Sequence, residues 1–287
     1  MKAKESSTDA AVAALLQGLA EAHGLDLTPY DTTFLQKTLD KRVAATGSAS
    51  IAAYGGYLAE HRTDAVVLEQ SLRIIYSEFF RNPLAFALLE QLILPGLIEA
   101  KARTDQGEIR VWSAGCATGQ EAWSVAMLLD ELTATAGAPP IAYRIFATDR
   151  SEPDLAQART GSYDAEAVGH VQARRLLTHF FRHGDAFVIA PRLRARVEFS
   201  NDDLLNANSA SPAASIYGDF DLVLCSNVLL YYRASARQFI LDKLCHALAP
   251  GGYLVTGETE RDIVAKHPGL RLVAPPAAVF QKPKQKI

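Results

Sequence analysis

The residues best suited to chemistry lie in one short segment, residues 109–124, which read IRVWSAGCATGQEAWS. A β-prone stretch ends there at Ala114, and a turn with Gly115 and Gly119 follows. A helical pattern then begins, with the carboxylate of Glu121 in its first turn. An open α/β sheet binds nucleotide-like cofactors at this position, beyond the carboxyl end of its first strand. The turn has two glycines, not the three of a dinucleotide-binding loop, and it lacks the Gly-Lys-Ser/Thr of a phosphate-binding loop. An acid at this turn favours a cofactor that carries a cation, such as S-adenosylmethionine with its sulfonium and α-amine.

Polar residues also follow the other β-prone stretches. Asp149 comes directly after residues 143–148, where an acid can accept hydrogen bonds from two ribose hydroxyls. The alternative for Asp149 is a cap for the next helix, and the alternative for Glu121 is compensation of its helix dipole. A third stretch, residues 220–226, leads into a group that we expect to line the same cleft, namely Cys225, Ser226 and Asn227.

The elements that must position these residues fall into two parts. Residues 1–80 show helical patterns, with expected helices over 9–23, 31–46, 50–61 and 64–76. Thr8 or Asp9 is the expected cap of the first helix. Pro83 suits the first turn of a long helix over 84–102. The sequence therefore predicts an all-helical N-terminal domain, residues 1–80, and a linker helix within residues 81–107.

From residue 108 on, β-prone and helical segments alternate. The expected strands are 109–113, 143–148, 220–226 and 253–256, and the expected helices are 120–133, 152–159 and 234–248. Short apolar strands separated by helices predict an α/β fold with a doubly wound, Rossmann-like parallel sheet. Residues 161–199 interrupt this alternation with a helix near 171–181 and strands at 186–190 and 194–199. We predict a small α+β insertion there, within a domain that covers residues 108–287.

The composition narrows the class of protein. Hydrophobic residues make up 49% and charged residues 21% of the 287 residues, which permits a large core and more than one domain. The formal net charge of −3 disfavours a nucleic-acid-binding protein. We find no segment with the roughly 18 apolar residues of a membrane span, and the three cysteines form no C-x-x-C pair. We therefore expect a cytoplasmic protein without membrane insertion. We expect no metal site, since His179 and His183 lack a third ligand.

Six ordered motifs point to a family. They are Phe-Phe-Arg at 79–81, Trp-Ser-Ala-Gly-Cys-x-Thr-Gly at 112–119, Ala-Thr-Asp at 147–149, Asn-Val-Leu-x-Tyr at 227–231, Pro-Gly-Gly-x-Leu at 250–254 and Gly-Glu-Thr-Glu at 257–260. In this order they resemble the CheR family of chemotaxis receptor-glutamate methyltransferases, from about residue 27 to residue 260. The resemblance implies a helical N-terminal domain and a class I methyltransferase domain with a small β-subdomain. It also implies S-adenosylmethionine as methyl donor, S-adenosylhomocysteine as product, and receptor glutamates as acceptors.

The resemblance assigns roles to individual residues. Arg81 is implied to lie in the active site with Tyr231, where the Arg81 guanidinium would hold the acceptor carboxylate and the Tyr231 hydroxyl would orient it. The alternatives are an interdomain salt bridge for Arg81 and a buried aromatic beside Tyr232 for Tyr231. The implied cofactor-binding residues are Ser77, Arg81, Ala114, Gly115, Glu121, Asp149, Asp203, Leu204, Cys225, Ser226 and Asn227.

Among these, Glu121 is expected to bind the α-amine and Asp149 the ribose. Asp203 and Leu204 are expected to flank adenine, with an ordinary polar turn over residues 200–203 as the alternative.

Two departures from the family concern the methyl acceptor. Ser226 stands where the family commonly has arginine. Residues 1–80 carry seven Lys/Arg against ten Asp/Glu, where receptor methyltransferases tend to be basic. The first expectation is carboxyl O-methyl transfer to a chemoreceptor-like protein. The alternatives are a related methyltransferase with a small-molecule or peptide acceptor, and a non-catalytic module that binds the cofactor and regulates a partner.

Overall fold

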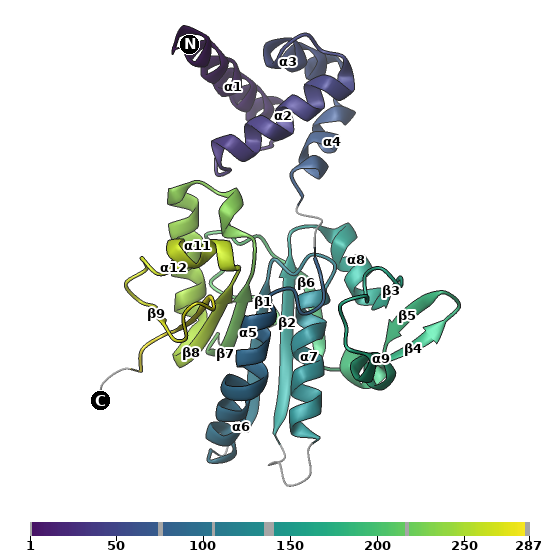
Figure 1. Ribbon diagram of the computed structural model, residues 1–287. Helices are drawn as coiled ribbons and strands as arrows, with labels where there is room; N and C mark the ends of the chain where they lie inside the picture. Colours follow the sequence, from purple (N-terminus) through teal and green to yellow (C-terminus); the bar gives the residue numbers. More distant parts are fainter. Residues whose placement is uncertain (1, 74–76, 105–106, 135–140, 216–217, 285–287) are drawn as a thin grey trace. The chain divides into compact units, whose positions relative to one another are not determined.

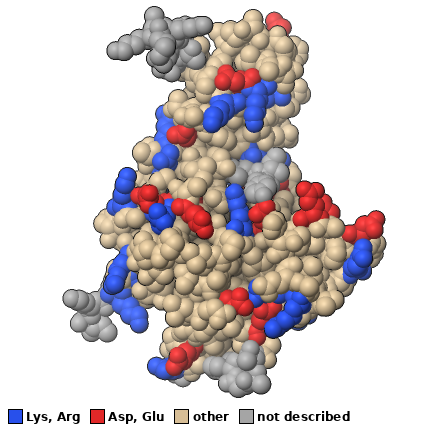
Figure 2. Space-filling view, viewed as in Figure 1, with Lys and Arg blue, Asp and Glu red and all other residues tan. Residues whose placement is uncertain are grey.

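The computed structural model describes residues 2–73, 77–104, 107–134, 141–215 and 218–284, with side chains from residue 11 onward. It divides into two compact units. The first contains Met1–Ile74 together with Leu230–Arg237, and the second contains Ile75–Leu229 and Gln238–Ile287. On the face shown in Figure 2, the described Lys and Arg side chains lie interspersed with Asp and Glu.

Within the first unit, the described residues 2–73 form the helices α1 (Lys2–His23), α2 (Thr32–Thr46), α3 (Ile51–Glu60) and α4 (Thr63–Ser71). Helix α2 has the ends that the sequence predicts. The Asp31 carboxylate caps it by accepting hydrogen bonds from the backbone N–H groups of Thr33 and Phe34, and Gly47 ends it at φ +67°. The cap expected at Thr8 or Asp9 is wrong, because α1 already begins at Lys2. Helix α4 ends at Ser71, and residues 74–76 of its expected range lie outside the described residues.

The second unit is organised around a seven-stranded sheet (Figure 1). Its order is β6 (Val197–Asn201), β2 (Ala142–Asp149), β1 (Glu108–Ala114), β7 (Phe220–Cys225), β8 (Leu248–Thr256), β10 (Val279–Gln281) and β9 (Arg271–Leu272). The pairs from β6 to β8 are parallel, whereas β10 is antiparallel to both of its neighbours. The strand order reverses at β1, which pairs with β2 on one side and β7 on the other. In open α/β sheets, ligands bind beyond the carboxyl ends of the strands at such a reversal.

Helices connect these strands, and the main ones match the sequence-based expectation. They are α7 (Gln120–Thr133), α8 (Glu152–Thr160) and α11 (Ala234–Ala247). The short α12 (Arg261–Val264) was not predicted from the sequence. Figure 1 shows α7 running alongside β2. The expected Rossmann-like α/β fold is thus confirmed.

The helix over Pro83–Ala102 differs from expectation in two ways. By length and composition alone it is apolar enough to cross a membrane, although the sequence analysis found no such segment. In the structure, Leu89, Ile93 and Ile98 from this helix pack in the core of the second unit. The helix is also interrupted, because a π-helical turn (Leu89–Ile93) separates α5 (Pro83–Leu88) from α6 (Leu94–Ala102). Pro95 follows this turn and donates no backbone hydrogen bond, so the widened turn accommodates it.

The insertion forms a separate three-stranded sheet of β3 (Ser162–Tyr163), β5 (Ala186–Ile189) and β4 (Phe180–His183), with helices α9 (Ala173–His179) and α10 (Pro191–Arg194). The strand expected at 194–199 is misplaced by the sequence analysis. It is β6, which begins at Val197 and pairs in parallel with β2 in the main sheet.

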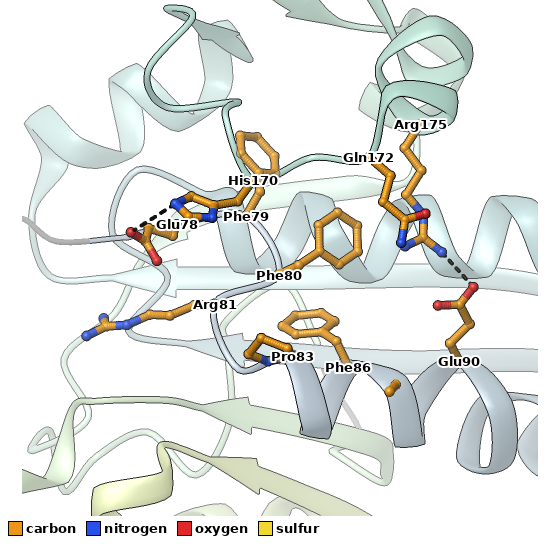
Figure 3. A pocket seen from close by; sticks show the side chains of 11 residues that line it. Glu78, Phe79, Phe80, Arg81, Pro83, Phe86, Glu90, His170, Gln172 and Arg175 are labelled. Carbon is orange, nitrogen blue, oxygen red and sulfur yellow. Dashed lines mark hydrogen bonds and ion pairs between the residues drawn. The ribbon is translucent and has the colours of Figure 1, made fainter.

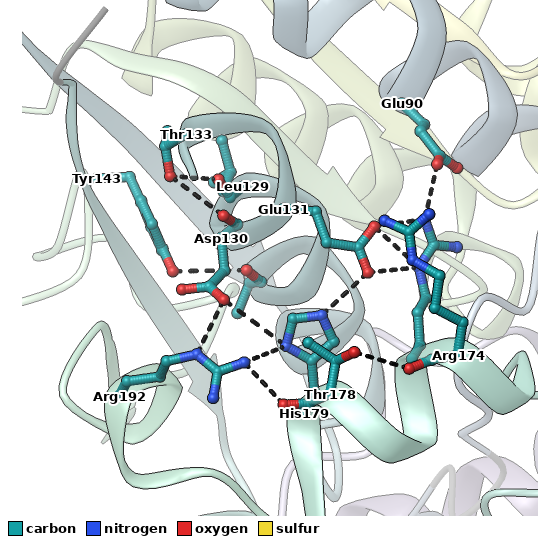
Figure 4. Close-up of polar contacts among 12 residues, drawn as sticks. Glu90, Leu129, Asp130, Glu131, Thr133, Tyr143, Arg174, Thr178, His179 and Arg192 are labelled. Atoms are coloured by element: carbon teal, nitrogen blue, oxygen red, sulfur yellow. Dashed lines mark hydrogen bonds and ion pairs between the residues drawn. The ribbon is translucent and has the colours of Figure 1, made fainter. Parts of the chain in front are cut away.

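A cluster of charged side chains attaches the insertion to α7 (Figure 4). The Glu131 carboxylate accepts hydrogen bonds from Arg175 Nη2 at 3.0 Å and from His179 Nε2 at 2.9 Å. Arg175 also donates to Glu90 at 2.7 Å. Burial alone would raise the pKa of Glu131, but the hydrogen bonds from Arg175 and His179 outweigh it and lower that pKa. The fully buried His179 is therefore a structural residue of this attachment.

We predict that Arg175→Met destabilises the protein by about 3–5 kcal/mol, because it leaves two carboxylates without their buried partner. Chemical denaturation checks this. Arg174→Met is the matched control, since Arg174 lies next to Arg175 on α9 and is exposed. Equal unfolding free energies in the two variants would contradict the structural importance of the cluster.

Candidate functional site

The site begins where β1 ends. Ala114 is fully buried there, and the backbone N–H groups of Gly115 and Cys116 both donate to Thr148 O, at 2.8 and 2.9 Å. Gly115 has φ +75°, and a Cβ atom on it would lie 2.7 Å from Cγ2 of Val228. The turn after β1 is therefore fixed between the ends of β2 and β7, and only glycine fits without displacing Val228.

Glu121 lies in the first turn of α7 and is largely removed from water. Ser113 Oγ donates to its Oε1 at 2.8 Å, and the Ser226 hydroxyl is a second hydrogen-bond partner. Burial raises the pKa of Glu121 to about 7, against these two hydrogen bonds and the positive charge of Arg81, which lower it. A cation beside this carboxylate would favour its ionised form. The hydrogen bonds from Ser113 and Ser226 to Glu121 are specific contacts, which compensation of a helix dipole does not require.

Asp149 at the end of β2 is held by two backbone groups. Its Oδ2 accepts from the N–H of Ala117 and its Oδ1 from the N–H of Ser151, both at 2.9 Å. Helix α8 is capped by Ser151, whose Oγ accepts from the backbone N–H of Asp154, so the cap alternative considered for Asp149 belongs to Ser151. Burial raises the pKa of Asp149 above its ordinary value. Each carboxylate oxygen keeps a further lone pair for a ligand hydroxyl.

The two residues expected beside adenine follow β6 and differ in exposure. Asp203 is exposed and its Oδ1 accepts from the N–H of Leu205 at 2.9 Å, as in the polar-turn alternative. Leu204 is buried. Lys243 Nζ donates to the backbone oxygen of Asp203 at 3.2 Å, which fixes this turn against α11. Contact with adenine stays a prediction for both residues.

The segment after β7 carries the next three expected residues. Cys225 is fully buried, and burial raises the pKa of its thiol. Ser226 reaches Glu121. Asn227 has φ +61°, and its Oδ1 atom is buried without a hydrogen-bond partner among the described residues. A buried acceptor without a partner among the described residues fits a ligand that brings a hydrogen-bond donor.

The Phe-Phe-Arg motif lines a cavity of about 390 Å³ between α5 and the insertion (Figure 3). Phe79 is fully buried, 5.0 Å from the ring of Tyr163. Phe80 donates its N–H to Ser124 Oγ at 3.0 Å, and its ring lies under the guanidinium of Arg175 at 4.8 Å. Figure 3 shows Arg81 extending away from Phe80. The motif therefore uses its aromatic rings for packing, while the positive charge of Arg81 acts on Glu121.

Two expected residues are less closely tied to this arrangement. Ser77 is half-buried at the start of the Phe-Phe-Arg segment. Tyr231 belongs to the first unit, where its ring packs edge-on against Phe34 at 4.8 Å and its backbone oxygen accepts from Asp31 N–H at 2.8 Å. Tyr232, and not Tyr231, is the buried tyrosine of the pair. The pairing of Tyr231 with Arg81 stays a prediction.

In the structure Ser226 and Arg81 both act on Glu121 by lowering its pKa. Three further residues contribute that the sequence analysis did not select. These are Ser113, which bonds Glu121, Ser124, which holds Phe80, and Glu260, which accepts from the N–H groups of Asn227 and Leu229. Ser113 could have been selected from the sequence, because it is a serine within a mainly apolar strand. Glu260 lay within a quoted motif, but its partners are more than 30 positions away, so spacing alone did not reveal them.

The chain also resembles known proteins. Residues 76–270 match the family described as CheR methyltransferase, SAM binding domain. "Chemotaxis protein methyltransferase 1" of Pseudomonas aeruginosa is 36% identical over 208 residues, which cover 71% of this chain and 70% of that protein. The chemotaxis protein methyltransferase of Listeria monocytogenes is 30% identical, with 83% of this chain and 85% of that protein covered. The corresponding protein of Escherichia coli is 28% identical, with 88% and 85% covered. The chain therefore belongs to the CheR family and is an S-adenosylmethionine-dependent methyltransferase.

Proposed function

We propose that this methyltransferase methylates carboxylates in the cytoplasm, with glutamate side chains of a chemoreceptor-like protein as its acceptors. The observation that carries the proposal is the half-buried carboxylate of Glu121, which follows the strand where the order reverses, accepts a hydrogen bond from Ser113 and has its pKa lowered by the positive charge of Arg81. The carboxylate suits the cationic cofactor and the guanidinium suits an anionic acceptor. The names of the three relatives described above, each a chemotaxis protein methyltransferase, support the same acceptor class.

In this proposal the two ends of the cofactor are held by two acids. Glu121 accepts from the α-amine, and Asp149 accepts from the ribose hydroxyls while its backbone contacts keep it rigid. The surrounding contacts come from Ser77, Arg81, Ala114, Gly115, Asp203, Leu204, Cys225, Ser226 and Asn227. The buried Oδ1 of Asn227 would gain the partner that it lacks among the described residues.

The chemistry needs positioning more than proton transfer. Bound S-adenosylmethionine supplies a methyl group on a cationic sulfur. An acceptor carboxylate oxygen bonds to the methyl carbon as the carbon–sulfur bond breaks, and the electron pair of that bond stays on sulfur. A glutamate with a pKa of about 4.3 is already ionised at pH 7, so no general base is required. Arg81 orients the acceptor, and orientation of this kind contributes up to roughly 7–11 kcal/mol.

Transfer of a labelled methyl group distinguishes the possible acceptors. We expect label from [methyl-³H]S-adenosylmethionine on receptor cytoplasmic fragments, and its release as methanol on mild base treatment, as for a carboxyl methyl ester. Label that resists base would contradict carboxylate methylation.

A second candidate function is methylation of a small-molecule or peptide acceptor. It is favoured by Ser226, which bonds Glu121 where the family commonly has arginine, and by the acidic balance of residues 1–80. Label on a metabolite fraction, with none on receptor fragments, would support this candidate instead.

We predict that Asp149→Ala weakens S-adenosylhomocysteine binding by about 1.5–3 kcal/mol, the size of hydrogen bonds to a charged group. Titration calorimetry measures the change. Asp185→Ala, at an exposed turn of the insertion, is the control. Unchanged affinity in the Asp149 variant would remove this residue from the cofactor site.

A further inference from the structure

Glu260 is a fully buried carboxylate at the end of a short 3-10 helix, η3 (Glu258–Glu260), and it contacts three backbone groups. Its Oε2 accepts from the N–H groups of Asn227 and Gly257, both at 2.8 Å, and its Oε1 accepts from the N–H of Leu229 at 2.7 Å. A buried charge is costly unless hydrogen bonds compensate it, and bonds to a charged acceptor are about twice as strong as neutral ones. The carboxylate therefore fixes the backbone on both sides of residue 228.

The backbone that Glu260 fixes is in an uncommon conformation. Asn227 has φ +61°, in the left-handed region that non-glycine residues rarely occupy. Such a conformation persists only when its surroundings determine it. Glu260 supplies this constraint by holding Asn227 directly and Leu229 two residues later.

The side chain of Asn227 is fixed by the same motif. A Cβ atom on Gly257 would lie 2.4 Å from Asn227 Nδ2 and 3.0 Å from Glu260 Oε2, so the absence of a side chain at 257 gives Asn227 its place. The Oδ1 of Asn227 remains buried without a partner among the described residues. The first and last residues of the Gly-Glu-Thr-Glu motif, Gly257 and Glu260, thus both fix Asn227 after the end of β7.

We propose that Glu260 is a positioning residue of the cofactor site, which holds the segment after β7 so that Ser226 meets Glu121 and Asn227 presents its amide to the cofactor. This inference rests on the proposed placement of the cofactor at Glu121 and Asp149. Glu260 acts through Asn227 and Ser226 and touches no reacting atom. Its charge also reaches Glu121, since it raises the pKa of that carboxylate.

The test compares Glu260→Gln with Glu258→Gln, which changes an exposed carboxylate of the same motif. The probe is S-adenosylhomocysteine, titrated by calorimetry at 15 °C between pH 5.5 and 7.5. At pH 7.5 we expect Glu260→Gln to weaken binding about tenfold, because an amide cannot accept at both of its ends. We also expect the midpoint of the pH dependence to move to lower pH, since a negative charge near Glu121 is removed. Glu258→Gln should bind like the unchanged protein.

A purely structural Glu260 would lower the melting temperature and leave both the affinity and the pH midpoint of the folded variant unchanged, and that result overturns the inference. If Glu260→Gln does not fold, Gly257→Ala is the variant that tests the inference. Its added Cβ atom displaces Asn227, while the charge of Glu260 is kept. Weaker binding without a pH shift supports the inference, and unchanged binding overturns it. Failure of the proposed cofactor placement gives a different result, namely normal binding by Glu121→Gln and Asp149→Ala.

Discussion

Replacement of Glu121 by Gln should weaken S-adenosylhomocysteine binding by about 10- to 100-fold at pH 7.5, the range expected for the loss of a charged hydrogen bond. The proposal gives Glu121 the α-amine of the cofactor, and a neutral amide keeps the shape but loses the charge. Ser113 and Ser226 can still bond the amide oxygen, so the fold around α7 should remain. Calorimetric affinity equal to that of the unchanged protein would refute the assignment.

The same carboxylate should make cofactor binding depend on pH. The pKa of Glu121 is raised to about 7, so below pH 7 the residue is largely protonated and must lose its proton to accept an ammonium group. Affinity should therefore rise between pH 5.5 and 7.5, with proton release that calorimetry in two buffers detects. In Glu121→Gln this dependence should be absent, and an identical pH profile in the variant would assign the titration to another group.

The ligand-free protein should show the opposite trend in stability. The folded-state pKa of Glu121 lies above its ordinary value of 4.5. Its contribution to stability is therefore complete below about pH 4.5 and is lost as the pH rises through about 7. Melting temperatures of the unchanged protein and of Glu121→Gln should differ in slope over this interval, since only the former carries this titration.

Replacement of Arg81 by Ala should lower kcat about a hundredfold, the cost of a small misplacement of reacting groups. The affinity for S-adenosylhomocysteine should change much less, because the guanidinium is proposed to hold the acceptor. A modest decrease in affinity near neutral pH is expected, since loss of the positive charge raises the pKa of Glu121 further.

Arg81→Lys separates the two effects, because it keeps the charge but loses the planar fork that suits a carboxylate. We expect cofactor affinity to recover and kcat to remain low. Arg103→Ala, at a 74% exposed side chain, serves as the control. Normal kcat in Arg81→Ala would remove this residue from the mechanism.

Local patterns in the sequence predicted much of the sheet and its helices. Helix α7 begins and ends where its pattern does, at Gln120 and Thr133, because a glycine-containing turn and a continuous apolar face mark it. The strand β6 was misassigned because its partner β2 is about 50 positions away and pairing is not a local property. The π-helical turn before Pro95 could not be predicted either, because the helical periodicity of a sequence assumes the same number of residues in every turn. The domain boundaries at residues 80 and 107 stay predictions.

The candidate site shows the same division between local and long-range information. Glu121 could be selected because it lies in the first turn of the helix after β1, and Asp149 because it ends β2. The partners that fix their properties come from elsewhere in the chain, such as Ser226 for Glu121. The burial that raises both pKa values is a tertiary property, so it could not be read from residue types.

The close approach of Gly115 to Val228 has a consequence for protein engineering. The methyl groups of Val228 occupy the volume that any side chain at position 115 would need. A mutational library that diversifies position 115 alone will return glycine, and one that also shortens residue 228 still meets the backbone penalty of a positive φ. Positions 115 and 228 therefore form one design unit, and a redesign for enlarged cofactor analogues has to start from position 228.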